Sequence, residues 1–131
     1  MSHPYGKLIL CVDDETTGLS IRKALLETQG YRVLTAESGP KALSLFSREP
    51  LDLVVLDYSM PGMEGHDVAE AMKRLKPDVP IIMLSAYVDL PPKTLAVVDA
   101  CVTKGDPSLL LLKSVSDLLS GNEEPRARQA G

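Results

Sequence analysis

The sequence LDLVVLDYSMPGMEG, from Leu51 to Gly65, decides the fold. Apart from Asp52, its first six residues are apolar, and such a short run is typical of a parallel strand covered by helices on both faces. Asp57 follows the run directly, and the proline and glycines after it predict an open loop. A carboxylate that ends a buried strand lies where open α/β sheets bind their ligands, although a single Asp at such a place is also a common turn cap.

Four more apolar runs predict strands, at residues 7–12, 31–36, 79–84 and 100–103. A helical spacing of apolar residues predicts a helix after each strand. The expected inward-facing residues are Leu19, Ile21, Ala24, Leu25 and Leu26 in the first helix, Ala42, Leu43 and Phe46 in the second, Val68, Met72 and Leu75 in the third, residues 95–98 in the fourth, and residues 109–112, Val115, Leu118 and Leu119 in the fifth.

Polar residues and glycine indicate where these helices begin and end. Thr16 or Thr17 is the expected N-cap of the first helix, and Gly30 is its expected end. Asp89 is the expected N-cap of the fourth helix, and Asp106 that of the fifth.

Five strands that alternate with five helices predict a parallel sheet with right-handed crossovers and helices on both faces. For 131 residues we expect the flavodoxin-like, doubly wound α/β fold with strand order 2-1-3-4-5. Residues 7–121 form one domain in this interpretation. Residues 1–6 are an N-terminal extension, and residues 122–131 are a disordered tail or the start of a linker.

Composition narrows the function classes. The net charge is -4 and no basic helix compensates for it, so we expect no direct binding to nucleic acid. No apolar run approaches the roughly 18 residues that cross a bilayer, so we expect a cytoplasmic protein without membrane contact. Cys11 and Cys101 each lie in an apolar segment and outside any CxxC pattern, which favours core thiols.

Polar side chains end four of the predicted strands. They are Asp13 and Asp14 after the first strand, Asp57 after the third, Ser85 after the fourth and Lys104 after the fifth. Because parallel strands point the same way, all five residues lie at one edge of the sheet. Three neighbouring carboxylates repel one another unless a cation neutralises them, and oxygen ligands without His or Cys favour Mg²⁺. Taken alone, each residue also has a simpler interpretation: Asp14 as a helix N-cap, Ser85 as a hydroxyl with a hydrogen-bond partner, and Lys104 as a solvated surface charge.

With a metal in place, this set suits phosphoryl transfer. The transferring group carries its charge on three equatorial oxygens, which need cations and hydrogen-bond donors around them. Mg²⁺ can take one oxygen, the Lys104 ammonium a second and the Ser85 hydroxyl a third. Asp57, at the centre, is then the expected nucleophile.

At this point the chain resembles the receiver domain of two-component response regulators, over about residues 7–120. The matching features are the Asp13-Asp14 pair after LILCV, Asp57 after LDLVVL with MPGMEG behind it, Ser85 after IIML and Lys104 after CVT. The set is specific because it fixes residue type and strand position together.

The resemblance implies that Asp57 accepts a phosphoryl group from a histidine kinase, a phosphotransfer protein or a small donor such as acetyl phosphate. It also implies direct Mg²⁺ ligation by Asp14, Asp57 and the main-chain carbonyl of Ser59, with Asp13 acting mainly through water.

The resemblance further implies that Ser85 and Lys104 hold the acyl phosphate and carry the conformational signal. That signal changes a face formed by the fourth helix, the fifth strand and the fifth helix. A downstream protein, or an output domain beyond Gly131, reads this face, and a homodimer is left open. Such a module is a signalling receiver rather than an enzyme, because it catalyses only its own phosphotransfer and dephosphorylation.

Several positions depart from the family or tune it. Gly105 follows Lys104, where the family usually has a proline after a cis peptide; a non-proline cis bond costs roughly 3 kcal/mol, so we expect a trans bond here. Cys101 replaces an aromatic switch residue and cannot make the same swing. By the resemblance, Tyr87 and Ser59 flank the incoming water, and a bulky Tyr87 could shield the acyl phosphate.

Three alternatives stay open. Gly105 and Cys101 suit a pseudo-receiver, which acts independently of phosphorylation as a scaffold or dimerisation module. An aspartate-nucleophile phosphatase also forms an aspartyl phosphate, but it usually has a second Asp where this chain has Ser59. A flavodoxin-type electron carrier fits the fold, yet the chain lacks the first-loop phosphate cradle and, with no Trp and one Phe, the usual flavin-stacking aromatics.

Overall fold

The computed structural model describes residues 6–60 and 62–121, so residues 1–5 of the expected extension and the expected tail at 122–131 lie outside the described residues. The strands are β1 Leu8–Val12, β2 Arg32–Ala36, β3 Leu53–Asp57, β4 Ile81–Ser85 and β5 Ala100–Thr103. The helices are α1 Thr16–Glu27, α2 Gly39–Arg48, α3 Gly65–Leu75, α4 Pro92–Leu95 and α5 Ser108–Gly121. All strand pairs are parallel and the order is β2-β1-β3-β4-β5, which confirms the predicted flavodoxin-like α/β fold.

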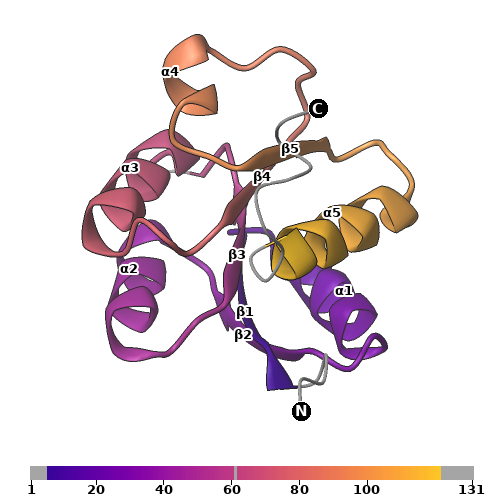
Figure 1. Cartoon of the computed structure of the whole chain (residues 1–131). Helices are drawn as coiled ribbons and strands as arrows, with labels where there is room; N and C mark the ends of the chain where they lie inside the picture. Colours follow the sequence, from indigo (N-terminus) through magenta and orange to yellow (C-terminus); the bar gives the residue numbers. More distant parts are fainter. Residues whose placement is uncertain (1–5, 61, 122–131) are drawn as a thin grey trace.

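The sheet separates two halves of the hydrophobic core. Helices α2 and α3 cover one face, and α1 and α5 cover the other (Figure 1). Successive strand residues alternate between the halves, as a period of two requires: Leu10 packs with the α2 and α3 side, Ile9 with the α1 and α5 side. Every residue of β1, β3 and β4 is buried, so the ends of these central strands are held rigidly.

Helix α1 differs from its prediction at its cap and on its inner face. Glu15, not Thr16 or Thr17, is the N-cap, and its side chain accepts a hydrogen bond from the Gly18 N–H at 2.6 Å. The helix ends at Glu27 with Thr28 as its C-cap, two residues before the predicted end Gly30, which lies in the left-handed region at φ 92°. The helix buries Leu19 and Leu26, while the expected inner residues Ile21 and Ala24 are exposed.

Helices α3 and α5 also bury fewer apolar residues than predicted. Leu75 is exposed at the end of α3, and Leu109 and Leu110 are exposed at the start of α5. Four consecutive leucines extend around the helix, and only Leu111 of this run lies fully on the face toward the sheet. Asp106 does not cap α5; its carboxylate accepts a hydrogen bond from the Thr103 N–H at 3.3 Å within the preceding loop.

Helix α4 is a single turn in the connection between β4 and the edge strand β5, at the top of Figure 1. Pro91 precedes it, so the predicted cap Asp89 is wrong, and Leu95 is exposed rather than inward. The turn is held by the buried Thr94, whose hydroxyl lies 3.2 Å from His66 Nδ1 of α3.

The two cysteines differ in burial. Cys11 is buried in β1, and burial raises the pKa of its thiol to about 12, in agreement with a core thiol. Cys101 is exposed, which contradicts the prediction. It pairs in register with Met83 on the face that α4 would cover, and a one-turn α4 leaves that face open. Within residues 6–60 and 62–121, no helix has the length and apolar character that a membrane span requires.

Candidate functional site

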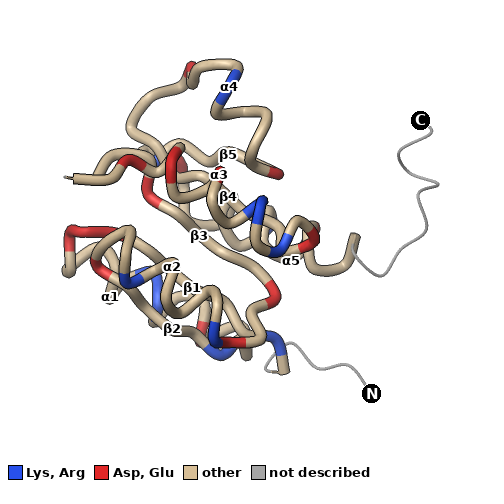
Figure 2. Tube along the Cα trace, turned by 90° about the vertical axis from the view of Figure 1, so that its left-hand side faces the viewer, with Lys and Arg blue, Asp and Glu red and all other residues tan. Residues whose placement is uncertain are grey.

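Three acidic side chains meet at the carboxyl edge of the sheet, as the strand order predicts. Asp13 follows β1 and Asp57 ends the adjacent β3. One carboxylate oxygen from each of Asp13, Asp14 and Asp57 lies within 4.8 Å of the others. Asp13 and Asp57 are 1% and 2% exposed, whereas Asp14 is exposed. Figure 2 shows acidic segments in red at this left-hand edge of the molecule.

Lys104 joins the acids from the end of β5. Its Nζ lies 2.9 Å from Asp57 Oδ1 and 3.6 Å from Asp13 Oδ2. The Lys104 main-chain N–H donates to the Ser85 carbonyl at 2.7 Å, which continues the pairing of β4 with β5 and fixes the lysine backbone. None of the described peptide bonds is cis, so the bond to Gly105 is trans as predicted.

Ser85 ends β4 and lies between Asp57 and Lys104 in strand order. Its side chain is buried, and its Oγ accepts a hydrogen bond from the Tyr87 N–H at 2.8 Å. This hydrogen bond leaves the hydroxyl proton of Ser85 available to a group at the edge of the sheet.

Ser59 and Tyr87 line a hollow beside the end of β3. The hollow has a volume of about 470 Å³ and is lined by Tyr58, Ser59, Met60, Glu64 and Tyr87. Both predicted tuning residues thus lie in one hollow, together with Tyr58, the residue after Asp57. Cys101 does not line this hollow; its side chain is exposed on β5.

Gly65 holds the loop after Asp57 tightly against the end of β3. A Cβ atom at Gly65 would lie 2.4 Å from the Asp57 carbonyl oxygen and 2.8 Å from Tyr58 Cα. The Gly65 N–H donates to the Tyr58 carbonyl at 2.8 Å. Only glycine permits this approach, so the start of α3 positions the backbone of Asp57.

The buried acids have opposite pKa shifts. Burial raises the pKa of Asp57 to about 6, and the neighbouring Asp13 carboxylate adds to the rise while the Lys104 ammonium opposes it. Burial also acts to raise the pKa of Asp13, but the Glu15 N–H, a hydrogen bond with Asp57 and two nearby cations together lower it. Asp57 is therefore the acid that keeps a proton more readily.

The second cation near Asp13 is Arg22, which was not among the residues predicted from the sequence. Arg22 Nη2 of α1 donates to Asp13 Oδ2, and the arginine side chain is 17% exposed. The signal was present in the sequence: Arg22 lies three residues after Leu19 and four before Leu26, the two buried residues of α1. A charged residue at such an inward position predicts a buried partner.

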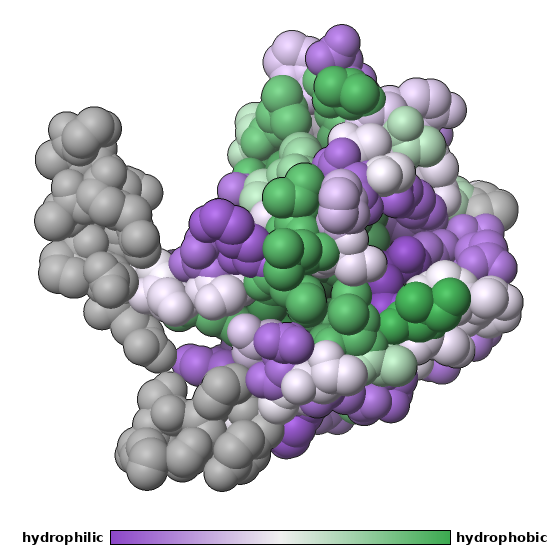
Figure 3. Space-filling model, turned by 90° about the vertical axis from the view of Figure 1, so that its right-hand side faces the viewer, coloured by the Kyte–Doolittle hydropathy of each residue, from purple (hydrophilic) through white to green (hydrophobic). Residues whose placement is uncertain are grey.

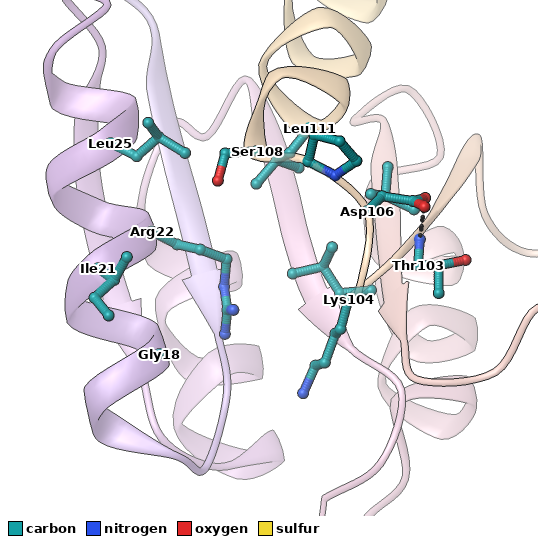
Figure 4. A pocket seen from close by; sticks show the side chains of 12 residues that line it. Gly18, Ile21, Arg22, Leu25, Thr103, Lys104, Asp106, Ser108 and Leu111 are labelled. Atoms are coloured by element: carbon teal, nitrogen blue, oxygen red, sulfur yellow. Dashed lines mark hydrogen bonds between the residues drawn. The ribbon is translucent and has the colours of Figure 1, made fainter.

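Arg22 and Lys104 also line a groove between α1 and the start of α5 (Figure 4). The groove has a volume of about 210 Å³ and is lined mainly by Ile21, Leu25, Leu84, Val102, Pro107 and Leu111 besides the two cations. Its apolar wall therefore ends in positive charge next to the acids.

The donor set fits a hard divalent cation. The three clustered groups are all carboxylates, and oxygen ligands are those that Mg²⁺ prefers. An acid with a raised pKa beside an ammonium and a hydroxyl is suited to act as a nucleophile whose product carries negative oxygens.

Comparisons with known proteins agree with this site. The sequence model of one protein family, the response regulator receiver domain, matches residues 9–104 of this chain. The chain is 44% identical over 78 residues to the response regulator SaeR of Staphylococcus aureus, an alignment that covers 60% of this chain and 34% of SaeR. The match thus spans about a third of the length of that curated relative.

Solved structures have the same fold. A CheY-like receiver domain protein of Methanospirillum hungatei superposes with a TM-score of 0.85 at 32% identity, covering 89% of this chain and 96% of that one. The response regulator TrrA of Thermotoga maritima, solved with Mg²⁺ and BeF, gives 0.79 at 38% identity, covering 86% and 98%. TrrA has also been solved in complex with the histidine kinase ThkA. On its fold, its family match and its edge of acids, this chain belongs to the response regulator receiver domains of two-component systems.

Proposed function

We propose that Asp57 is the phosphoacceptor of this receiver domain and that residues 7–121 form the unit that is phosphorylated. The observation that carries the proposal is the position of Asp57, buried at the end of β3 with the Lys104 ammonium at 2.9 Å and two further acids within 4.8 Å. A residue that only caps a turn needs neither a neighbouring ammonium nor two further carboxylates.

The transfer itself requires an ionised Asp57. A carboxylate oxygen of Asp57 attacks phosphorus, the bond from phosphorus to the donor nitrogen or oxygen breaks, and the donor leaves with that electron pair. Lys104 neutralises charge on one oxygen of the product, and the Ser85 hydroxyl donates to another. The module thereby changes its own state and turns over no outside substrate.

Asp14, Asp57 and the Ser59 carbonyl would hold Mg²⁺ directly, with Asp13 acting through water. When bound, Mg²⁺ would neutralise charge on the transferring phosphoryl oxygens. The clustering of three carboxylates supports this assignment, and the TrrA complex with Mg²⁺ and BeF gives a precedent in the family.

The phosphodonor is a histidine kinase or a phosphotransfer protein in this proposal. Its entry is favoured along the apolar groove between α1 and α5, where the exposed Ile21 lies near the site. Figure 3 shows hydrophobic side chains, in green, on the face that these helices form. The complex of ThkA with TrrA gives the family precedent for the partner.

The phosphorylated state is read on the face formed by α4, β5 and α5, by a downstream protein or by an output domain beyond Gly131. The exposed Val88, Leu95 and Leu110 support an apolar contact surface there. Since Cys101 cannot act as an aromatic switch, the signal passes through Ser85, Tyr87 and the short α4.

The test is phosphorylation of the full chain by acetyl phosphate with and without Mg²⁺. We expect one added phosphoryl group by intact mass and a shifted band on a Phos-tag gel, both dependent on Mg²⁺. Asp57→Asn should abolish the modification. Asp117→Asn, which removes an exposed acid of α5 paired with Lys113, should leave it unchanged. A wild-type chain that gains no phosphoryl group would refute the proposal.

A phosphorylation-independent pseudo-receiver is the second candidate, because Cys101 is exposed and α4 is reduced to one turn. It would act as a scaffold or a dimerisation module. Beryllofluoride with Mg²⁺ separates the two: an active receiver binds it at Asp57 and shifts its amide spectrum, whereas a pseudo-receiver does not respond.

A further inference from the structure

We infer that Arg22 is a built-in counterion of the acidic site, which holds Asp13 in the resting chain and opposes the binding of Mg²⁺. Arg22 is then a positioning residue that sets the Mg²⁺ concentration at which the site is filled. Because this role needs the metal, it rests on the proposed Mg²⁺ site.

Both oxygens of Asp13 already have partners from the chain. Oδ1 accepts from the Glu15 N–H at 3.0 Å, and Oδ2 accepts from Arg22 Nη2 with Lys104 Nζ at 3.6 Å. Lys104 lies closer to Asp57, at 2.9 Å, so Arg22 is the principal cation of Asp13. A metal ion or its bound water that contacts this buried carboxylate has either to displace the guanidinium or to bind next to its positive charge.

Gly18 leaves open the space that the guanidinium of Arg22 occupies. Gly18 lies one turn before Arg22 on α1, and a Cβ there would lie 3.5 Å from each of the Arg22 nitrogens Nη1 and Nη2. A longer side chain at this position would occupy the space of the guanidinium. Figure 4 shows Arg22 and Lys104 pointing from opposite walls of the groove toward the same region. The space over Gly18 therefore lets the guanidinium lie against Asp13, where the hydrogen bond from Arg22 Nη2 to Asp13 Oδ2 holds it.

The charges give the consequence. Three carboxylates face two cations, so the resting cluster carries one net negative charge, whereas without Arg22 it would carry two. A divalent cation gains less from the smaller negative charge. Phosphorylation adds a further negative charge at Asp57, which Arg22 helps to balance. Arg22 thus weakens Mg²⁺ binding before phosphoryl transfer and is compatible with the metal after it.

The experiment is calorimetric titration of Mg²⁺ into the metal-free full chain at pH 7, compared with R22Q and K23Q. Lys23 is the matched control: it neighbours Arg22 on α1, carries the same charge, and pairs with Glu27 at 2.7 Å in a partly exposed position. We expect R22Q to lower the Kd for Mg²⁺ on the order of tenfold, within the usual range of coupling between two sites. K23Q should change it less than about twofold, as expected for a screened surface charge.

Two further measurements do not depend on removing the arginine. G18M keeps the net charge but crowds the guanidinium, because its Cβ would lie 3.5 Å from Arg22 Nη1 and Nη2 and 3.0 Å from the capping oxygen Oε1 of Glu15; it should tighten Mg²⁺ binding in the same direction as R22Q. In wild-type protein, the side-chain NMR signal of Arg22 should move and broaden on addition of Mg²⁺.

The outcomes separate this role from the proposed function. Equal Mg²⁺ affinity in wild type and R22Q, an equal gain in K23Q, or an Arg22 signal that ignores saturating Mg²⁺ would refute the role of Arg22 and leave the metal site standing. Absence of Mg²⁺ binding in every form would refute the metal site and this role together.

Discussion

The Lys104 ammonium reaches from the end of β5 across the end of β4 and lies 2.9 Å from Asp57 Oδ1 on β3. The backbone of Lys104 is held to Ser85 by a hydrogen bond of 2.7 Å, so the ion pair is aligned by the sheet rather than by a loop alone. We expect this ion pair to affect both the rate of phosphorylation of Asp57 and the pKa of its carboxyl group.

Replacement of Lys104 by methionine should slow phosphorylation of Asp57 by acetyl phosphate on the order of 100-fold, because one preorganised charge at the product oxygens is lost. The pKa of Asp57 should rise further above its usual value, since the ammonium now opposes that rise. Quench-flow kinetics and NMR titration of the Asp57 carboxyl measure the two effects. Lys113→Met, on the exposed surface of α5, is the control; equal rates in all three proteins would contradict the prediction.

Asp57→Asn should stabilise the metal-free protein at pH 7. Burial raises the pKa of Asp57 to about 6, so the folded protein binds a proton more readily than the unfolded chain between about pH 4 and 6. The contribution of Asp57 to the free energy of unfolding of wild type is therefore most favourable at low pH, and it is lost as the pH rises through 6. The neutral amide avoids this loss, and we expect a gain of roughly 1–3 kcal/mol at pH 7.

Urea unfolding in chelator at pH 7 and pH 4 checks this prediction. The gain should shrink toward zero at pH 4, where Asp57 is protonated in the folded protein and about half protonated in the unfolded chain. A gain of the same size at both pH values would show that the amide acts through packing and not through ionisation.

Tyr87→Ala should shorten the lifetime of the phosphorylated protein. Tyr87 is 61% exposed, yet it lines the hollow beside Ser59 at the end of β3, and we expect its ring there to limit the approach of water. We expect dephosphorylation to be about threefold to tenfold faster, the range of a partial barrier to one water molecule. Decay of the acyl phosphate after removal of donor measures it, with Tyr87→Phe as the control that keeps the ring.

Gly65→Ala should destabilise the domain by about 2–3 kcal/mol, because its Cβ would lie 2.4 Å from the Asp57 carbonyl oxygen and backbone atoms cannot simply rotate away. Gly105→Ala is the matched control, since nothing lies within 4 Å of a Cβ at that position. Urea unfolding of the two variants should separate them clearly. Equal midpoints would mean that the α3 junction yields more easily than its geometry indicates.

The sequence predicted the strand order and the acidic edge because both follow from a few strong patterns. β1 is apolar throughout, and β3 and β4 are apolar up to their last residues, Asp57 and Ser85. The polar residues at the strand ends fall at one edge by the geometry of parallel sheets. Asp13, Asp57 and Lys104 needed only that geometry to be placed together.

The contacts that cross between elements could not be predicted in the same way. Arg22 reaches Asp13 because α1 packs with Leu19 and Leu26 inward, and a broad apolar stripe that includes Ile21 hides this orientation. Glu15 competes with two threonines as the N-cap, and only the path of the chain after β1 decides between them.

The one-turn α4 has a consequence for how the domain responds to its surroundings. A helix of four residues does not persist by its own hydrogen bonds, so this segment keeps its shape through anchors such as Thr94 and Leu90. Amide protons there should exchange with solvent long before those of the central strands. A molecule that binds at α4 therefore contacts the part of the domain that changes its conformation at the lowest cost in free energy.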